Sequence, residues 1–149
     1  MLIRCFPVTI NSKTGLQFDG QWSQVTLRNR GLDSWLASGD LVAASPLTYS
    51  VVNNGSTSFD FTKDAVTTSN LSITLPRYDE LVLNINATGH PLWIKDTQST
   101  GAGSSTVSFG LIQNNGAQTG TIRFRPTKAG TYYYNCQFHA SMAGTITVT

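Results

Sequence analysis

Apolar and polar residues alternate along much of this chain with a period of two, which is the pattern of half-buried β-strands. The cleanest alternation lies at residues 71–75, 81–87 and 121–125. Apolar residues nowhere recur at helical spacing over three turns, and the nearest candidate for a helix is a stretch of one or two turns at residues 31–39. The pattern therefore predicts an all-β protein.

Short turn sequences separate these runs. Residues 48–62 are predicted to form a β-hairpin around Asn53-Asn54-Gly55, because an Asn-Gly pair favours a tight turn. Residues 114–116 repeat the Asn-Asn-Gly sequence, and residues 97–106 form a polar, glycine-rich loop. Many short strands joined by Gly, Pro and Asn turns predict an antiparallel Greek-key β-sandwich.

The last two predicted strands lie within residues 130–148 and frame a short loop. One face of the first strand is predicted to point inward and holds Tyr132, Tyr134 and Cys136. Asn135 falls on the opposite face. Trp93, on a shorter strand upstream, is predicted to lie in the core.

The composition fits one globular domain with an appendage. The chain has 149 residues, of which 40% are hydrophobic and 12% charged, and this length is enough to bury a substantial core. Residues 47–149 keep the sandwich pattern, whereas residues 1–46 hold Trp22 and Trp35 and end at Ala43-Ala44-Ser45-Pro46. We therefore expect an N-terminal extension or attachment segment at residues 1–46 and a sandwich domain at residues 47–149.

Charge and hydropathy exclude two classes of partner. The formal net charge is only +2 and the basic residues are scattered, so we predict no nucleic-acid binding. No apolar run approaches the length of a membrane span.

The first seven residues lack the apolar segment of a secretory signal. We expect a periplasmic or extracellular protein if a leader is missing from the sequence as given, and a virion-associated one otherwise.

Three metal-binding side chains lie close together between the last two predicted strands. Cys136, His139 and Met142 follow the spacing Cys-x2-His-x2-Met, and a tight loop can turn all three toward one point. The only other histidine of the sequence, His90, stands near the end of the strand predicted at residues 81–87. Two imidazoles, a thiolate and a long axial thioether make up the blue-copper set, which suits single-electron transfer.

Residues 130–142 resemble the copper-binding signature of the cupredoxins, the plastocyanin, azurin and amicyanin group. The short Cys-x2-His-x2-Met loop is most similar to that of amicyanin, and Gly89-His90 resembles the upstream ligand site. The resemblance covers about residues 47–149. It implies a cupredoxin-like fold that binds one type 1 copper ion and exchanges electrons with a redox partner protein. The ligands it implies are His90, Cys136 and His139 in the equatorial positions and Met142 in the axial one.

One position departs from this resemblance. Cupredoxins usually have an asparagine after the first ligand histidine, where its side chain braces the cysteine loop, but this chain has Pro91 there. Proline adds stiffness and no side-chain hydrogen bond. We expect the difference to affect the reduction potential and copper affinity more than ligation. Phe138 and Pro91, which flank the two histidines, are predicted to form an apolar patch for a docking partner.

Four other roles for these side chains are alternatives to a single copper site. A disulfide between Cys5 and Cys136 is less favoured, because Cys136 has a better role as a metal ligand and small disulfide scaffolds use more cysteines. A zinc site is less favoured, because methionine is a poor zinc ligand and no second cysteine is nearby. A nucleophilic Cys–His pair needs only proximity, but no orienting group or oxyanion site is visible. A multicopper oxidase would need more than the two histidines present. We therefore expect no enzymatic activity.

A second function, from a different class, follows from residues 1–46. A soluble electron carrier does not need this segment, whose Trp22, Trp35 and Leu36 must pack against something. A polar surface with few charges is also common in virion proteins. The alternative is a structural or decoration module of a virus capsid or tail, with or without bound copper, whose partners would be neighbouring subunits of the assembly.

Overall fold

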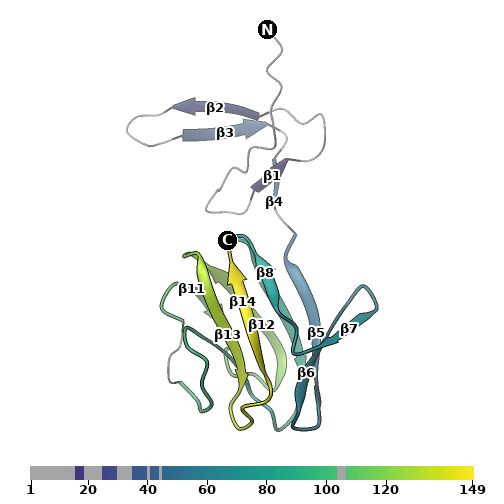
Figure 1. The fold of residues 1–149 in the computed structure, drawn as a ribbon. Helices are drawn as coiled ribbons and strands as arrows, with labels where there is room; N and C mark the ends of the chain where they lie inside the picture. Colours follow the sequence, from purple (N-terminus) through teal and green to yellow (C-terminus); the bar gives the residue numbers. More distant parts are fainter. Residues whose placement is uncertain (1–15, 19–24, 30–34, 40, 44, 104–106) are drawn as a thin grey trace. The chain divides into compact units, whose positions relative to one another are not determined.

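The computed structural model describes residues 16–18, 25–29, 35–39, 41–43, 45–103 and 107–149. These residues form β-strands joined by turns and loops, with no helix among them (Figure 1). Within the same residues no helix is long and apolar enough to cross a membrane. The prediction of an all-β protein is confirmed.

The chain divides into two compact units, Met1–Ser45 and Pro46–Thr149. In the first unit, β1 (Leu16–Phe18) pairs with β4 (Leu41–Ala43), and β2 (Val25–Asn29) pairs with β3 (Trp35–Gly39); both pairs are antiparallel. The helical turns suggested for residues 31–39 are wrong where the structure describes them, because β3 is held in a ladder with β2. Trp22 lies outside the described residues, and the role of an attachment segment stays a prediction.

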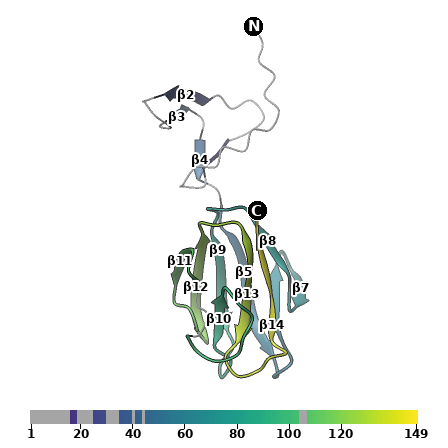
Figure 2. The same cartoon turned by 60° about the vertical axis from the view of Figure 1, so that its left-hand side comes forward.

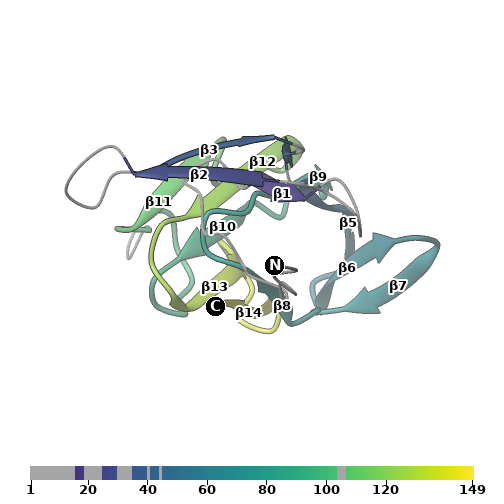
Figure 3. The same cartoon turned by 90° about the horizontal axis from the view of Figure 1, so that it is seen from above.

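The second unit is a sandwich of two sheets that face each other, as seen from above in Figure 3. The smaller sheet contains, in spatial order, β10 (Leu92–Lys95), β13 (Gly130–Cys136), β14 (Ala143–Val148) and β8 (Ile73–Leu75). The larger sheet contains, in spatial order, β11 (Gly110–Gln113), β12 (Thr119–Pro126), β9 (Leu81–Asn86), β5 (Leu47–Asn54), β6 (Ser58–Lys63) and β7 (Val66–Ser69).

The sandwich was predicted as antiparallel, and each sheet in fact contains one parallel pair, β5 with β9 and β14 with β8. The connectivity explains the parallel pairs. Between β5 and β9 the chain passes into the smaller sheet at β8 and returns, so that β9 runs beside β5 in the same direction. The remaining strand pairs are antiparallel, and the sandwich prediction itself is confirmed.

Local sequence patterns explain two elements of the larger sheet. The hairpin of β5 and β6 turns at Gly55, whose φ of +55° is the left-handed conformation that glycine adopts without strain. In β9 and the residue after it, the inward face is fully apolar, and the exposed fractions of Leu81, Leu83, Ile85 and Ala87 lie between 0% and 4%. These residues join one core cluster with Ile122 and Phe124 of β12 and with Tyr132 and Tyr134 of β13 in the facing sheet.

The outer face of the smaller sheet differs from the prediction. Trp93, predicted in the core, pairs with Asn135 across β10 and β13 on the outer face and is only half-buried. Asn135 and Lys95 lie on that same face and are buried, with exposed fractions of 3% and 0%. The loop after β10 contacts this face, because the Lys95 ammonium donates to the carbonyl of Gly101 and the Gly101 amide donates to the carbonyl of Gln137.

Two loops meet at one end of the sandwich. Strand β10 follows β9 and runs antiparallel to β13, so β9 and β13 end at the same side. The loop between β9 and β10 and the loop between β13 and β14 therefore lie together, at the end away from the C-terminus (Figure 2). This is the end that holds the predicted metal-binding side chains.

Candidate metal centre

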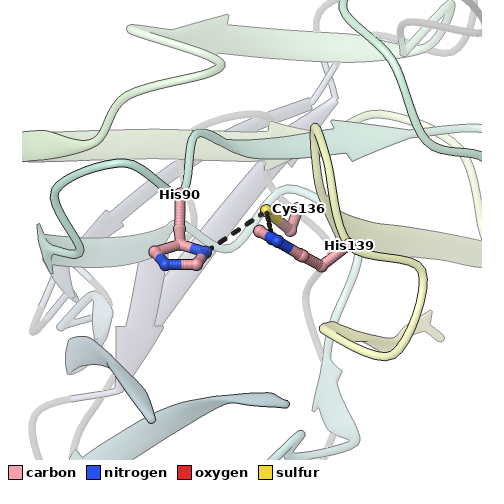
Figure 4. A group of neighbouring side chains, drawn as sticks. All are labelled: His90, Cys136 and His139. Atoms are coloured by element: carbon pink, nitrogen blue, oxygen red, sulfur yellow. Dashed lines mark hydrogen bonds between the residues drawn. The ribbon is translucent and has the colours of Figure 1, made fainter. Parts of the chain in front are cut away.

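His90, Cys136 and His139 point toward one another across these two loops (Figure 4). The Cys136 Sγ atom lies 3.8 Å from His90 Nδ1 and 3.5 Å from His139 Nδ1. One donor atom from each residue falls within 4.8 Å of the other two. The structure thus brings together three of the four residues proposed from the sequence, including His90, which lies 46 positions before Cys136.

The three side chains differ in their access to solvent. Cys136 is completely buried, whereas both histidines are half-buried. The two imidazole rings lie with their centroids 4.9 Å apart and their planes inclined by 38°. Cys136 forms no disulfide within the part of the chain that the structure describes, and the disulfide considered for it involves Cys5, which lies outside that part.

The loop between Cys136 and Met142 is closed by its own backbone. The Cys136 amide donates to the Met142 carbonyl at 2.8 Å, and the Met142 amide donates to the His139 carbonyl at 3.2 Å. The Phe138 amide approaches the Cys136 Sγ atom at 3.5 Å, which directs a donor at the sulfur. Met142 is completely buried within the same core cluster as Cys136. A ligand role for its thioether stays a prediction.

The residue after Cys136 ties this loop to the histidine segment. The Gln137 amide donates to the Pro91 carbonyl at 2.9 Å, and the Trp93 indole donates to the Gln137 side-chain oxygen at 3.2 Å. Pro91 thus contributes through its backbone, since its side chain has no hydrogen-bonding group. Sequence reasoning missed Gln137 and Trp93, because only the fold makes them neighbours.

A glycine turn and a glutamine position His90. The Gly89 amide donates to the Gln118 side-chain oxygen at 2.6 Å, and the His90 amide donates to the Ala87 carbonyl at 2.9 Å. Gly89 has a φ of +83°, a conformation in which an L side chain would be strained. The positive φ of this turn therefore explains why a glycine directly precedes His90.

The predicted apolar patch beside the histidines is half right. Phe138 is 60% exposed, and its ring meets the His139 ring edge-on, with centroids 6.5 Å apart and planes inclined by 81°. Pro91, however, is buried and offers no surface; it directly precedes β10, and its carbonyl accepts the Gln137 amide of the Cys136 loop. The exposed apolar surface at this end is thus provided by Phe138 rather than by a Phe–Pro pair.

The chemistry of the donor set agrees with copper. One sulfur and two imidazole nitrogens converge, and the group contains no carboxylate. Soft and intermediate donors of this kind suit copper or zinc and do not suit magnesium or calcium, which prefer oxygen ligands. A methionine at the end of the same loop adds a thioether that favours copper over zinc.

No family model matches the sequence, and no curated protein matches it. Solved structures of cupredoxins are similar to the chain. A purple cupredoxin from Nitrosopumilus maritimus is 18% identical, with 69% of this chain and 99% of that chain covered and a TM-score of 0.44. Reduced rusticyanin is 23% identical, covering 71% and 82% with a TM-score of 0.45. A reduced amicyanin variant is 18% identical, covering 72% and 86% with a TM-score of 0.42. At these values the likeness concerns the fold alone and assigns no role to any residue here.

Proposed function

We propose that residues 47–149 form a cupredoxin-like domain that binds one type 1 copper ion and transfers single electrons. The observation that carries the proposal is the convergence of the Cys136 sulfur with the Nδ1 atoms of His90 and His139, at 3.8 and 3.5 Å. Two imidazoles and one thiolate are the equatorial donors of a blue-copper site, and Met142 would supply the weak axial donor.

The protein would contribute rigidity to this site. A copper ion held there would supply a one-electron redox couple. Electron exchange is fast when the ligands move little between the two oxidation states, and the structure limits such movement. Cys136 ends a core strand, its loop is closed by two backbone hydrogen bonds, and Gln137 is fastened to Pro91 and Trp93. Hydrogen bonds of this kind around a metal site orient its ligands.

Burial supports electron transfer over substrate chemistry. Cys136 is shielded from solvent, whereas the half-buried histidines and the exposed Phe138 reach the surface. An imidazole bound to the copper ion would carry the electron to it, so no partner molecule would need to touch the buried sulfur. The partner would be a redox protein that docks over Phe138 and the histidine edges, where the exposed phenyl ring stands beside the half-buried imidazole of His139.

Two other functions lack such support. A nucleophilic Cys–His pair has suitable spacing here, with Cys136 Sγ 3.5 Å from His139 Nδ1. A nucleophile must contact its substrate, however, and the Cys136 side chain is completely buried. No feature of the described residues favours the virus-particle module over the copper domain.

Addition of Cu(II) to the metal-free protein under visible spectroscopy tests the proposal. The wild type should develop an intense thiolate-to-copper band at one equivalent, and Cys136→Ser should lack it. Cys5→Ser is the matched control, because it removes the only other cysteine and should leave the band unchanged. A wild type that stays colourless would reject the proposal, and a band that disappears in Cys5→Ser would reject the assignment of Cys136.

A further inference from the structure

Asn70 connects the loop between Cys136 and Met142 to the opposite sheet. Its side-chain NH₂ donates to the Ser141 carbonyl at 2.9 Å, and its side-chain oxygen accepts the Phe59 amide at 3.1 Å. The Asn70 backbone amide also donates to the Phe59 carbonyl at 2.8 Å. Phe59 belongs to β6 of the larger sheet, whereas Ser141 lies in the loop that joins two strands of the smaller sheet. A single side chain therefore bridges the two sheets at the metal-binding end.

The backbone at this position restricts which residue can make the bridge. Asn70 has a φ of +46°, in the left-handed region, which asparagine and aspartate tolerate better than most residues. Both halves of a side-chain amide are used, one as donor and one as acceptor. Aspartate would keep the acceptor for the Phe59 amide and lose the donor to Ser141. Glycine would adopt this φ without strain, but it has no side chain to form the hydrogen bonds to Phe59 and Ser141.

The bond to Ser141 acts on the methionine side of the ligand loop. Ser141 directly precedes Met142, whose carbonyl accepts the Cys136 amide. The Ser141 hydroxyl adds a second contact, to the Ser56 carbonyl at 2.9 Å. Pro91 and Trp93 fasten the cysteine side of the loop through Gln137, and neither of them contacts Ser141 by a hydrogen bond among the described residues. The two halves of the loop are thus held by different parts of the fold.

We propose that Asn70 is a positioning residue for the metal centre, which fixes Ser141 and thereby the placement of Met142 relative to Cys136. The part of this inference that concerns copper rests on the proposed function. The part that concerns loop order applies to the metal-free protein as well.

The first test uses hydrogen exchange of the metal-free protein. Asn70→Asp should accelerate exchange of the Met142 and Cys136 amides about five- to tenfold, the effect of losing one hydrogen bond that holds a local structure. Exchange of the Leu83 amide in the core of β9 should stay the same. Ser141→Ala is the matched control, since it removes the contact to Ser56 and keeps the carbonyl that Asn70 binds. Unchanged exchange at Met142 and Cys136, or equal acceleration at Leu83, would overturn the inference.

The second test uses the copper-loaded protein and distinguishes positioning from plain stability. Asn70→Asp should shift the position or relative intensity of the visible copper bands, whereas Ser141→Ala should shift them less. A spectrum of Asn70→Asp identical to the wild type would show that Asn70 does not position the ligands. Should the wild type bind no copper, the proposed function fails, and the exchange comparison still decides whether Asn70 orders the loop.

Discussion

Replacing Tyr134 by phenylalanine removes one partly buried hydrogen bond and keeps the aromatic ring that fills the core beside the metal-binding end. The Tyr134 hydroxyl donates to the Leu71 carbonyl at 2.8 Å. The ring is completely buried and lies 4.8 Å from the Phe61 ring, measured between centroids. Phenylalanine can occupy the same space, so the effect of the substitution comes from the lost hydroxyl.

The magnitude follows from the carbonyl that is left behind. Leu71 is half-buried, and an acceptor of this kind that loses its donor costs about 1–2 kcal/mol. For a domain of about 100 residues, each kcal/mol lowers the midpoint of thermal unfolding by about 4–8 °C. We therefore expect Tyr134→Phe to unfold roughly 4–16 °C below the wild type at neutral pH.

Ionisation of the phenol adds a pH signature. Burial raises the pKa of Tyr134 above the value near 10 of an exposed tyrosine. At pH values between about 10 and the raised pKa of Tyr134, the unfolded chain releases the phenol proton and the folded protein keeps it. The free energy of unfolding therefore falls as pH rises through this range. The stability that the hydroxyl confers is thus fully present below about pH 10 and is lost above it. The difference between wild type and Tyr134→Phe should be constant from neutral pH to about 9 and shrink beyond 10.

Urea unfolding of the metal-free wild type and of Tyr134→Phe, followed by circular dichroism at several pH values, measures both effects. The tyrosinate absorbance at alkaline pH provides a second measurement, because Tyr134 should lose its proton at a higher pH than an exposed tyrosine. Equal stability of the two proteins at pH 7, or a stability difference that grows above pH 10, would refute the reasoning about the Leu71 hydrogen bond.

Three further predictions concern the same domain. Gly144→Ala should destabilise the fold by about 1–3 kcal/mol in urea unfolding, because a methyl group there would overlap the Tyr134 ring; an unchanged midpoint would contradict this packing. Lys95→Met removes the ammonium bound by the carbonyls of residues 99–101, so a nonspecific protease should cut that loop several-fold faster, and equal cleavage of both proteins would be evidence against this tether. Met142→Leu should keep the copper band and raise the reduction potential in voltammetry, since the axial ligand tunes the potential; an unaltered potential would argue against the thioether as ligand.

Much of the sandwich could be predicted because its strands have strong local signals. The hairpin at β5 and β6 has an Asn-Gly turn between its two strands, and the apolar residues Leu81, Leu83 and Ile85 recur at every second position of β9. Strand β7 was missed because all four of its residues are exposed, so no apolar face indicates it. The parallel pairing of β5 with β9 was also missed, since residue periodicity does not specify the order of strands in a sheet.

The metal-binding residues could be proposed from the sequence because the chain has few candidates. The Cys-x2-His-x2-Met spacing is local, and His90 was the only other histidine available. The residues that hold the loop could not be found this way. Asn70 bonds to a residue 71 positions later, and no pattern near Asn70 indicates that contact. Nor does any local pattern indicate that Lys95 is buried; carbonyl oxygens of its own loop replace water around the ammonium.

A spectroelectrochemical titration tests the central claim most directly. The wild type, loaded with one equivalent of copper, is reduced and reoxidised in steps while its visible spectrum is recorded. We predict one electron per chain, bleaching of the thiolate-to-copper band on reduction, and full return of the band on reoxidation over repeated cycles. A protein that shows no such band, or whose band is lost irreversibly in the first cycle, would contradict a type 1 copper site built from His90, Cys136 and His139.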